Sequence, residues 1–410
     1  MRIGRITLLS FLAMLAITAS ACGRQTTRAQ SDGVLAFGGL LPETGDLSYL
    51  GPPMITGVNL AVQDINAAGG VLGKDVTAAP GDSGDNSTDI ANQTVDRHLT
   101  AGVDIIVGAG ASGVSLTVID KITGAGKIMF SPANTAKRFT DYPDNGLYFR
   151  TAPSDVLQGR VLGELVASEG NTTAVVISRD DSYGNGLRED TATAFRASGG
   201  EVVADFAYEP NAQNYDAEVQ RVVAANPDAI VIVGFDETAR ILATMIEQGV
   251  GPATKNIYGV DGNMAADLPA QVNPQNLGVL TGMKGTAPGA INEAFFARLR
   301  EAKPDLADTL YAAESYDAVI ITALAAAIAK TDAPGEVAAQ INGVTRDGEK
   351  CTTFADCMAL VEAGEDIDYD GQSGPLEFTD PGEPGAGDYR IMEYQPDGSL
   401  PIIGTREARL

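Results

Sequence analysis

The sequence alternates between short apolar segments and segments with helical spacing, and this rhythm constrains the fold more than any other feature. The first round contains four predicted strands, at Val34–Leu40, Val76–Ala79, Ile105–Val107 and Ile128–Phe130. A second round contains predicted strands at Ala174–Ser178, Val202–Phe206, Ala229–Val233 and Ile257–Val260. Strands that alternate with helices predict parallel sheets with right-handed crossovers. We therefore expect an α/β protein with two Rossmann-like lobes.

The last third of the chain does not repeat the rhythm. It contains a predicted strand at Leu277–Gly282, long predicted helices at Ile291–Lys303 and Leu310–Lys330, and short strand-like segments near the end. A chain of 410 residues exceeds one ordinary core, so we expect two domains. The simplest arrangement returns this last segment to complete one or both of them. We expect one lobe at 33–152 plus about 284–372, and the other at 153–283 plus about 373–410.

The first 22 residues predict export from the cytoplasm. Arg2 and Arg5 precede an apolar run at Ile6–Ile17, which is the pattern of a signal peptide. Small residues lead directly to Cys22, as in a bacterial lipoprotein box, so we expect Cys22 to carry the lipid. Cleavage near Ala29, which would leave a soluble secreted protein, is the alternative. The apolar run is shorter than the ~20 residues of a transmembrane helix.

These features predict an extracytoplasmic protein that touches the cell membrane through its lipid anchor alone. The polar residues 23–32 would form a flexible tether between that anchor and the folded body. The formal net charge of −26 argues against a nucleic-acid partner, which requires a basic surface. An acidic surface keeps an exported protein soluble, and we expect a monomer.

Two further cysteines, Cys351 and Cys357, lie close together in the chain. Outside the cytoplasm such a pair predicts a disulfide. A metal pair is the alternative, but no histidine or further cysteine lies nearby in the sequence. We therefore predict a disulfide and no metal site.

Two small polar turns follow neighbouring predicted strands. Gly110-Ala111-Ser112-Gly113 follows Ile105–Val107, and Ser131-Pro132-Ala133-Asn134-Thr135 follows Ile128–Phe130. In open α/β sheets, ligands bind outside the carboxyl ends of the strands, where helix N-termini offer N–H groups to anions. The turns predict a pocket wall for a small ligand with a negative group.

Enzymatic alternatives have weaker support. The segment Gly108–Gly113 matches the dinucleotide fingerprint G-x-G-x-x-G, so an oxidoreductase with a nucleotide cofactor is the alternative from a different class. The next predicted strand lacks the acid that would hold the ribose, and we expect no cofactor. The single histidine, His98, is expected on the surface of a helix, and no G-x-S-x-G nucleophile elbow is present. We predict a binding protein and not an enzyme.

A series of short segments carries a more specific signal. In chain order they are Leu40-Leu41-Pro42-Glu43-Thr44-Gly45, Gly57-Val58-Asn59-Leu60-Ala61-Val62, Ile65-Asn66 with Gly69-Gly70, Ser131-Pro132-Ala133, Asp181-Ser182-Tyr183-Gly184-Asn185-Gly186 and Tyr316-Asp317-Ala318. The series resembles the branched-chain amino acid (leucine, isoleucine and valine) binding proteins, which are type I periplasmic binding proteins of ABC transporters. The resemblance implies two lobes, joined by three crossovers, that close on an amino acid. It also implies an ABC permease and its ATPase subunits as partners.

The resemblance implies ligand contacts from the first lobe. Ser112 would hold the α-carboxylate through its hydroxyl, and Thr135 would hold the amino acid through its N–H and hydroxyl. The Ala133 carbonyl would accept a hydrogen bond from the α-ammonium. An aromatic residue near the first loop would contact the ligand side chain; Tyr49 is the candidate, although Leu50 could point inward instead.

From the second lobe, Tyr183 would close over the ligand, Phe235 would line its side-chain pocket, and Asp261 would pair with its ammonium group. Asp261 is shorter than the glutamate common at that position of the family, which leaves the identity of the amino acid open. A binder of amides, urea or aromatic acids and a receptor-like sensor on the same fold are the alternatives.

Overall fold

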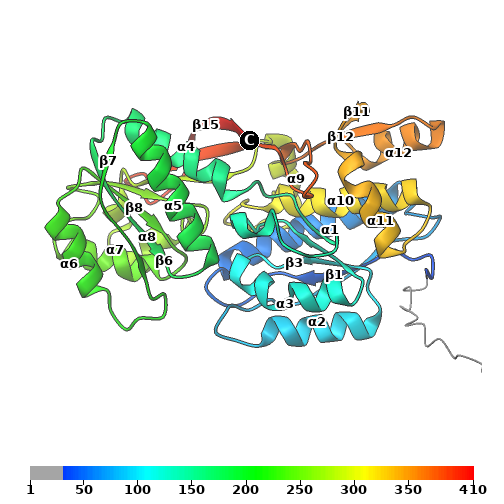
Figure 1. Cartoon of the computed structure of the whole chain (residues 1–410), viewed down its shortest axis with the longest axis horizontal. Coiled ribbons are helices and arrows are strands. Elements are labelled where there is room, and N and C mark those ends of the chain that lie inside the picture. The colour runs from blue at the N-terminus through cyan, green and yellow to red at the C-terminus, as the bar shows by residue number, and fades with distance from the viewer. Residues whose placement is uncertain (1–30) are drawn as a thin grey trace, which may run out of the picture.

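Two sheets form the centres of two α/β lobes that lie side by side (Figure 1). The computed structural model describes residues 31–410. The predicted signal peptide, Cys22 and most of the predicted tether lie outside the described residues. The predicted fold class, an α/β protein with two lobes built on parallel-rich sheets, is confirmed.

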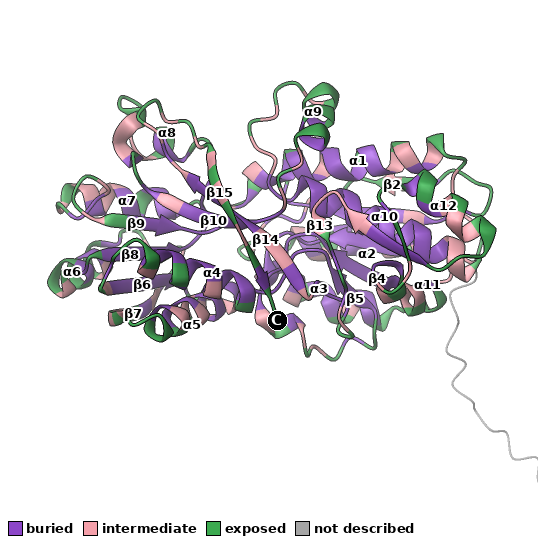
Figure 2. Cartoon of the chain, turned by 90° about the horizontal axis from the view of Figure 1, so that it is seen from above, coloured by how far each residue is buried: buried purple, intermediate pink, exposed green. Residues whose placement is uncertain are grey.

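The first sheet has five parallel strands in the order β2-β1-β3-β4-β5. They are β1 (Ala36–Leu40), β2 (Thr77–Ala79), β3 (Ile105–Gly108), β4 (Ile128–Ser131) and β5 (Tyr148–Arg150). Between them lie η1 (Ser48–Leu50), α1 (Gly51–Ala67), α2 (Ile90–Ala101), α3 (Ser112–Gly124) and η2 (Lys137–Phe139). Every residue of β3 and β4 is buried, as expected for parallel strands covered on both faces (Figure 2).

Helix α1 begins at Gly51 with two prolines. Pro52 and Pro53 occupy its first turn, where the missing N–H of proline removes no helical hydrogen bond. Gly57 in this helix allows close packing, because a Cβ there would overlap the carbonyl oxygen of Ala312. This contact brings α1 against the start of α10 (Ala312–Ala329).

The second sheet has seven strands in the order β15-β14-β10-β9-β8-β6-β7. Its strands are β6 (Thr173–Arg179), β7 (Glu201–Tyr208), β8 (Ala229–Val233), β9 (Asn256–Gly259), β10 (Lys284–Pro288), β14 (Ala386–Glu393) and β15 (Ile402–Arg409). The last two join antiparallel. Its helices are α4 (Asp155–Ser168), α5 (Ser182–Ala197), α6 (Asp216–Ala225), α7 (Thr238–Glu247) and α8 (Leu268–Val272).

The strand predicted at Leu277–Gly282 is wrong. Residues Leu277–Leu280 form the 3-10 helix η3, and the strand β10 follows it. A short apolar run does not distinguish a strand from a helical turn by periodicity alone. Because β10 pairs with β9 and β14, residues 284–288 belong to the second sheet and not to the first lobe as predicted.

The remaining elements lie with the first lobe. They are α9 (Glu293–Ala302), α10, α11 (Pro334–Ile341), η4 (Asn342–Val344), α12 (Phe354–Ala363) and a small sheet of β11 (Glu349–Cys351), β12 (Ile367–Gly371) and β13 (Gly374–Pro375). Helix α10 is apolar enough to cross a membrane by length and composition, but it is largely buried among these elements. A disulfide joins Cys351 at the end of β11 to Cys357 in α12.

Three connections link the two lobes. The chain crosses after Arg150, again after Pro288, and finally between Pro375 and Ala386. The C-terminus lies between the lobes, beside these connections (Figure 2). Three nearby connections form a hinge about which two rigid lobes can move.

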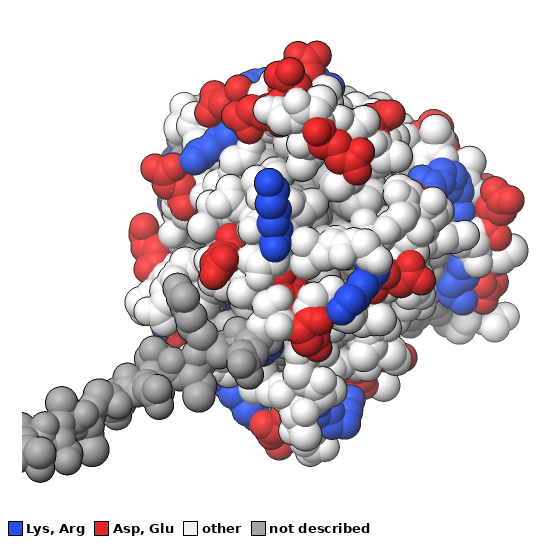
Figure 3. Space-filling view, turned by 90° about the vertical axis from the view of Figure 1, so that its right-hand side faces the viewer, with Lys and Arg blue, Asp and Glu red and all other residues white. Residues whose placement is uncertain are grey.

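The single histidine is buried, and its predicted surface position is wrong. His98 is 3% exposed, and its Nε2 lies 2.8 Å from the carbonyl oxygen of Gly39. Burial lowers the pKa of His98 and favours the neutral ring. On the outer face of the first lobe, acidic and basic side chains are scattered among uncharged residues (Figure 3).

Candidate ligand site between the lobes

A cavity between the lobes collects most of the predicted site residues. From the first lobe it is lined by Leu47, Leu50, Ala111, Ser112, Ala133 and Thr135. From the second lobe it is lined by Tyr183, Phe235, Asp261 and Gly262, and Tyr311 completes it. The space within it that is open to a water-sized molecule is about 10 Å³, which is about the room that one water needs. A larger ligand would therefore require the lobes to separate.

The first-lobe wall is made of two turns that are tied together. The Ser131 hydroxyl donates a hydrogen bond of 2.7 Å to the carbonyl oxygen of Ala109. The Asn134 side-chain amide donates to the carbonyl oxygens of Ala109 and Gly110, at 3.0 and 2.9 Å. These bonds fix the turn after β4 against the turn before α3. Since α3 begins at Ser112, the unpaired N–H groups of its first turn lie at this wall.

Arg150 supports the same wall from behind. This side chain is fully buried, and its guanidinium donates to the carbonyl oxygens of Asn134 and Ala136, at 3.2 and 3.0 Å. It also forms an ion pair with Glu383, with 2.8 Å between Nε and the carboxylate. The backbone around Thr135 is therefore held on both sides. A site held in this way is preorganised for its ligand.

The second-lobe wall consists of large side chains. The Tyr183 and Phe235 rings stack with their centroids 5.2 Å apart. The Arg179 guanidinium lies over the Phe235 ring, 3.6 Å from its centroid. Asp181 caps α5 by accepting a 2.8 Å hydrogen bond from the N–H of Gly184, which fixes the start of the helix that carries Tyr183.

Asp261 is the charged residue among those described as lining the cavity. It is 4% exposed, and its Oδ1 accepts hydrogen bonds from the Tyr183 hydroxyl at 2.8 Å and the Gln158 amide at 2.9 Å. Its Oδ2 accepts one from the Tyr311 hydroxyl at 2.6 Å. Burial raises the pKa of Asp261, and these three donors oppose that rise. The carboxylate forms an acidic end of the cavity.

Tyr311 and Gln158 were not predicted as site residues. Tyr311 directly precedes α10 and has a left-handed φ of 58°, which turns the chain before the helix begins. The sequence signal that could have identified Tyr311 is its position as an aromatic residue at the start of a predicted helix. Gln158 lies in α4, where a buried amide has no distinctive sequence pattern.

Leu50, and not Tyr49, lines the cavity. The Tyr49 hydroxyl instead donates a 2.8 Å hydrogen bond to the backbone carbonyl of Asp261. Tyr49 thus links the first lobe to the second beside the cavity. The six other predicted ligand contacts all lie on the cavity lining.

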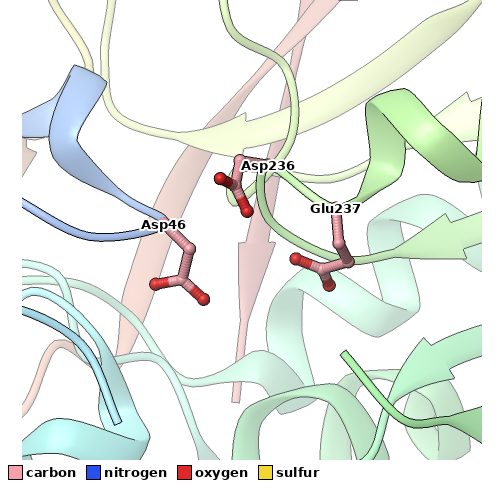
Figure 4. A group of neighbouring side chains, drawn as sticks. All are labelled: Asp46, Asp236 and Glu237. Carbon is pink, nitrogen blue, oxygen red and sulfur yellow. The ribbon is translucent and has the colours of Figure 1, made fainter. Parts of the chain in front are cut away.

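Three carboxylates near the mouth of the interlobe space come close enough to hold a metal ion (Figure 4). They belong to Asp46, Asp236 and Glu237. The chain supplies its own cation there, because Arg179 pairs with Asp46 at 3.0 Å and with Glu237 at 3.2 Å. Since Asp46 belongs to the first lobe and Arg179 to the second, this ion pair joins the lobes in the closed arrangement.

Comparisons with known proteins agree on the family of this chain. The sequence pattern of the periplasmic binding protein family matches residues 35–399. The substrate-binding protein BasB, from a chemotactic signal transduction system of Halobacterium salinarum, is 26% identical over 392 residues, which is 91% of this chain and 89% of BasB. The Leu/Ile/Val-binding protein BraC3 of Rhizobium johnstonii is 28% identical over 232 residues, which is 56% of this chain and 61% of BraC3.

Solved structures share the fold. The leucine binding protein LivK from Thermotoga maritima superposes with a TM-score of 0.75 at 21% identity and covers 91% of this chain and 98% of its own. LivJ from Streptococcus pneumoniae, in complex with isoleucine, has a TM-score of 0.73 at 22% identity, with 92% and 100% covered. A solute binding protein from R. palustris, in complex with 4-hydroxybenzoate, has a TM-score of 0.75 at 16% identity, with 92% and 98% covered.

Proposed function

Because the chain belongs to the periplasmic binding protein family, we propose that it captures an amino acid between its lobes and delivers it to an ABC permease. Two chemically opposite ends of the cavity carry this proposal. Asp261 offers a carboxylate for an ammonium group, whereas the turns at Ser112 and Thr135 offer N–H and hydroxyl donors for a carboxylate. A zwitterion satisfies both ends at once.

The walls between these ends favour an apolar side chain. Leu47, Leu50 and Phe235 contribute apolar surface, and the rings of Tyr183 and Tyr311 extend it. This lining favours a branched-chain amino acid or a close relative. An aromatic acid, as bound by the R. palustris neighbour, would place no cation beside Asp261. Asp261 therefore favours the amino acid.

Closure of the lobes is the proposed mechanism. A ligand that touches Ser112 and Asp261 contacts both lobes only when they are closed. It therefore stabilises the closed form by its difference in affinity for the two forms. The Arg179–Asp46 ion pair would add to that form, since it also spans the lobes.

A thermal-shift screen of the purified protein tests the ligand class. The panel contains all amino acids, common amides, urea, aromatic acids and a nicotinamide cofactor. We expect apolar amino acids to raise the melting temperature most. Stabilisation by amides or aromatic acids with no response to amino acids would overturn the amino-acid assignment, and stabilisation by the cofactor alone would favour an oxidoreductase.

A sensor is the second candidate, because BasB belongs to a signal transduction system and matches most of this chain. Both candidates bind a small ligand, and they differ in the partner that meets the closed protein. Crosslinking in membranes of the source cell, followed by mass spectrometry, separates them. Capture of a permease supports transport, whereas capture of a transducer without a permease supports sensing.

We also propose that the protein is exported and anchored through a lipid on Cys22. The Cys351–Cys357 disulfide is consistent with an oxidising compartment. In a bacterial host, the native chain should fractionate with membranes and Cys22→Ala should release it. Equal membrane association of both forms would contradict a lipid anchor at this residue.

A further inference from the structure

A second and larger cavity lies at the hinge. About 230 Å³ of it is open to water-sized molecules, and its described lining shares no residue with the ligand cavity. Thr151 lines it from the first connection between the lobes, Gly289 from the second, and Pro384 from the third. An occupant would touch all three connections.

The lining of this cavity includes a buried carboxylate that is incompletely hydrogen-bonded. Glu314, in the first turn of α10, lines the cavity and is 1% exposed. Within residues 31–410 its Oε2 has no hydrogen-bond partner. The neighbouring guanidinium of Arg390 donates instead to the carbonyl oxygens of Gly289 and Ala290, both at 3.0 Å. The Arg390 charge still acts on Glu314 through space, but the free carboxylate oxygen can accept a hydrogen bond from a further cation that reaches it.

The rim of the cavity is also acidic. Asp388 and Glu407 line it, and the one basic lining residue described, Arg409, forms an ion pair with Glu407. Asp388 therefore remains available for a second positive group. The carboxylates of this cavity are not close enough together to share a metal ion. Among the described residues, the acidic side chains that do lie that close together are those of Asp46, Asp236 and Glu237. Carboxylates on different elements of one lining, α10 and β14, suit an organic cation with two positive groups.

We propose that the hinge cavity is a second binding site, which takes a small alkyl diamine with one ammonium on Glu314 and the other on Asp388. Ammonium groups donate charge-assisted hydrogen bonds to carboxylates, and the alkyl chain packs on Pro153, Pro375 and Leu376 in the lining. This site is independent of the amino-acid site and does not rest on its assignment.

The charge of Glu314 sets the conditions of the test. Burial raises the pKa of Glu314 to about 7, the Arg390 guanidinium opposes that rise, and the Asp317 carboxylate on the same helix adds to it. Asp388, from β14, also has a pKa raised by burial. Titrations at pH 8 therefore keep Glu314 mainly ionised while an alkyl ammonium stays charged.

Isothermal titration of the purified protein with 1,4-diaminobutane tests the proposal, with butylamine as the probe that has a single ammonium. We expect saturable binding of one diamine, at least tenfold tighter than butylamine, and a loss of at least tenfold in Glu314→Gln. In Asp388→Asn, the affinity for the diamine should fall to that for butylamine, and the affinity for butylamine should not change. The control is Glu164→Gln, at an exposed position of α4, which should bind as the native protein does.

Two results would overturn the proposal. One is the absence of saturable diamine binding to the native protein. The other is equal diamine binding by the native protein, E314Q and D388N. This result would mean that the heat of binding comes from diamine on the acidic surface in general and not from this cavity. If E314Q does not fold, D388N alone still decides, because it changes a half-buried rim residue.

Discussion

The two walls of the ligand cavity are built in different ways. The first-lobe wall presents Ser112, Ala133 and Thr135, which are small residues in turns, and its geometry comes from backbone tied together by Ser131 and Asn134. The second-lobe wall presents large side chains whose positions depend on one another. The difference indicates that the first wall is shaped mainly by backbone, whereas the second is shaped by side chains and carries the charge.

The largest expected effect comes from breaking the support of the first wall. Arg150→Met removes the buried partner of Glu383 and the donors to the Thr135 turn. Removal of one partner of a buried ion pair costs about 3–5 kcal/mol. We expect a loss of this size in the free energy of unfolding, measured by urea denaturation.

The matched control for that variant is Arg196→Met, in which an exposed arginine of α5 is changed in the same way. Its effect should lie within about 0.5 kcal/mol of zero, as for most surface substitutions. Equal stabilities of the two variants would show that Arg150 does not hold the first wall.

The second wall is tested through its carboxylate. Asp261→Ala removes the group that would pair with an ammonium, and a hydrogen bond to a charged group is worth about 1.5–3 kcal/mol. We expect amino-acid affinity to fall by that amount, about 10- to 150-fold in Kd, in isothermal titration. Unchanged affinity would remove Asp261 from the site.

The two walls should also respond differently to pH. Burial raises the pKa of Asp261 above its ordinary value of 3.8, and the protonated form cannot pair with an ammonium. Amino-acid affinity should therefore fall as the pH is lowered through that raised pKa. Ser112→Ala should keep this dependence and Asp261→Asn should lose it; the same pH profile in both would contradict the division of charge between the walls.

A smaller effect is expected for the ion pair that spans the lobes. Asp46→Asn leaves Arg179 with its partners Asp181 and Glu237 in the second lobe. Partly exposed pairs contribute about 0.2–1 kcal/mol. We expect amino-acid affinity to weaken up to about fivefold while the unfolding free energy stays unchanged. Equal affinity with and without the Asp46 carboxylate would mean that the pair does not favour closure.

Local patterns explain why much of the fold could be predicted. Strands β3 and β4 lie close to their predicted bounds, because continuous apolar runs that end in turns specify buried parallel strands. The turns after them could be placed at one sheet edge for the same reason. His98 was misplaced, since helical spacing alone did not show which face of α2 meets the sheet.

The second wall depends on contacts between distant parts of the chain, which a single sequence does not display. Tyr311, directly before α10, and Gln158, in α4, reach Asp261 from positions far from it in sequence. The choice between Tyr49 and Leu50 depended on the direction of one 3-10 turn. Resemblance to a family placed Tyr183, Phe235 and Asp261 on the cavity lining, but it did not reveal the hydrogen bonds that hold the carboxylate.

The most direct test of the account measures whether one ligand needs both walls at once. Isothermal titration would compare the amino acid with the largest thermal shift against its deaminated acid and its decarboxylated amine. The account predicts that each analogue binds at least tenfold more weakly than the amino acid, because each leaves one wall without its partner. An acid or an amine that binds as tightly as the amino acid would contradict a zwitterion held between the two lobes.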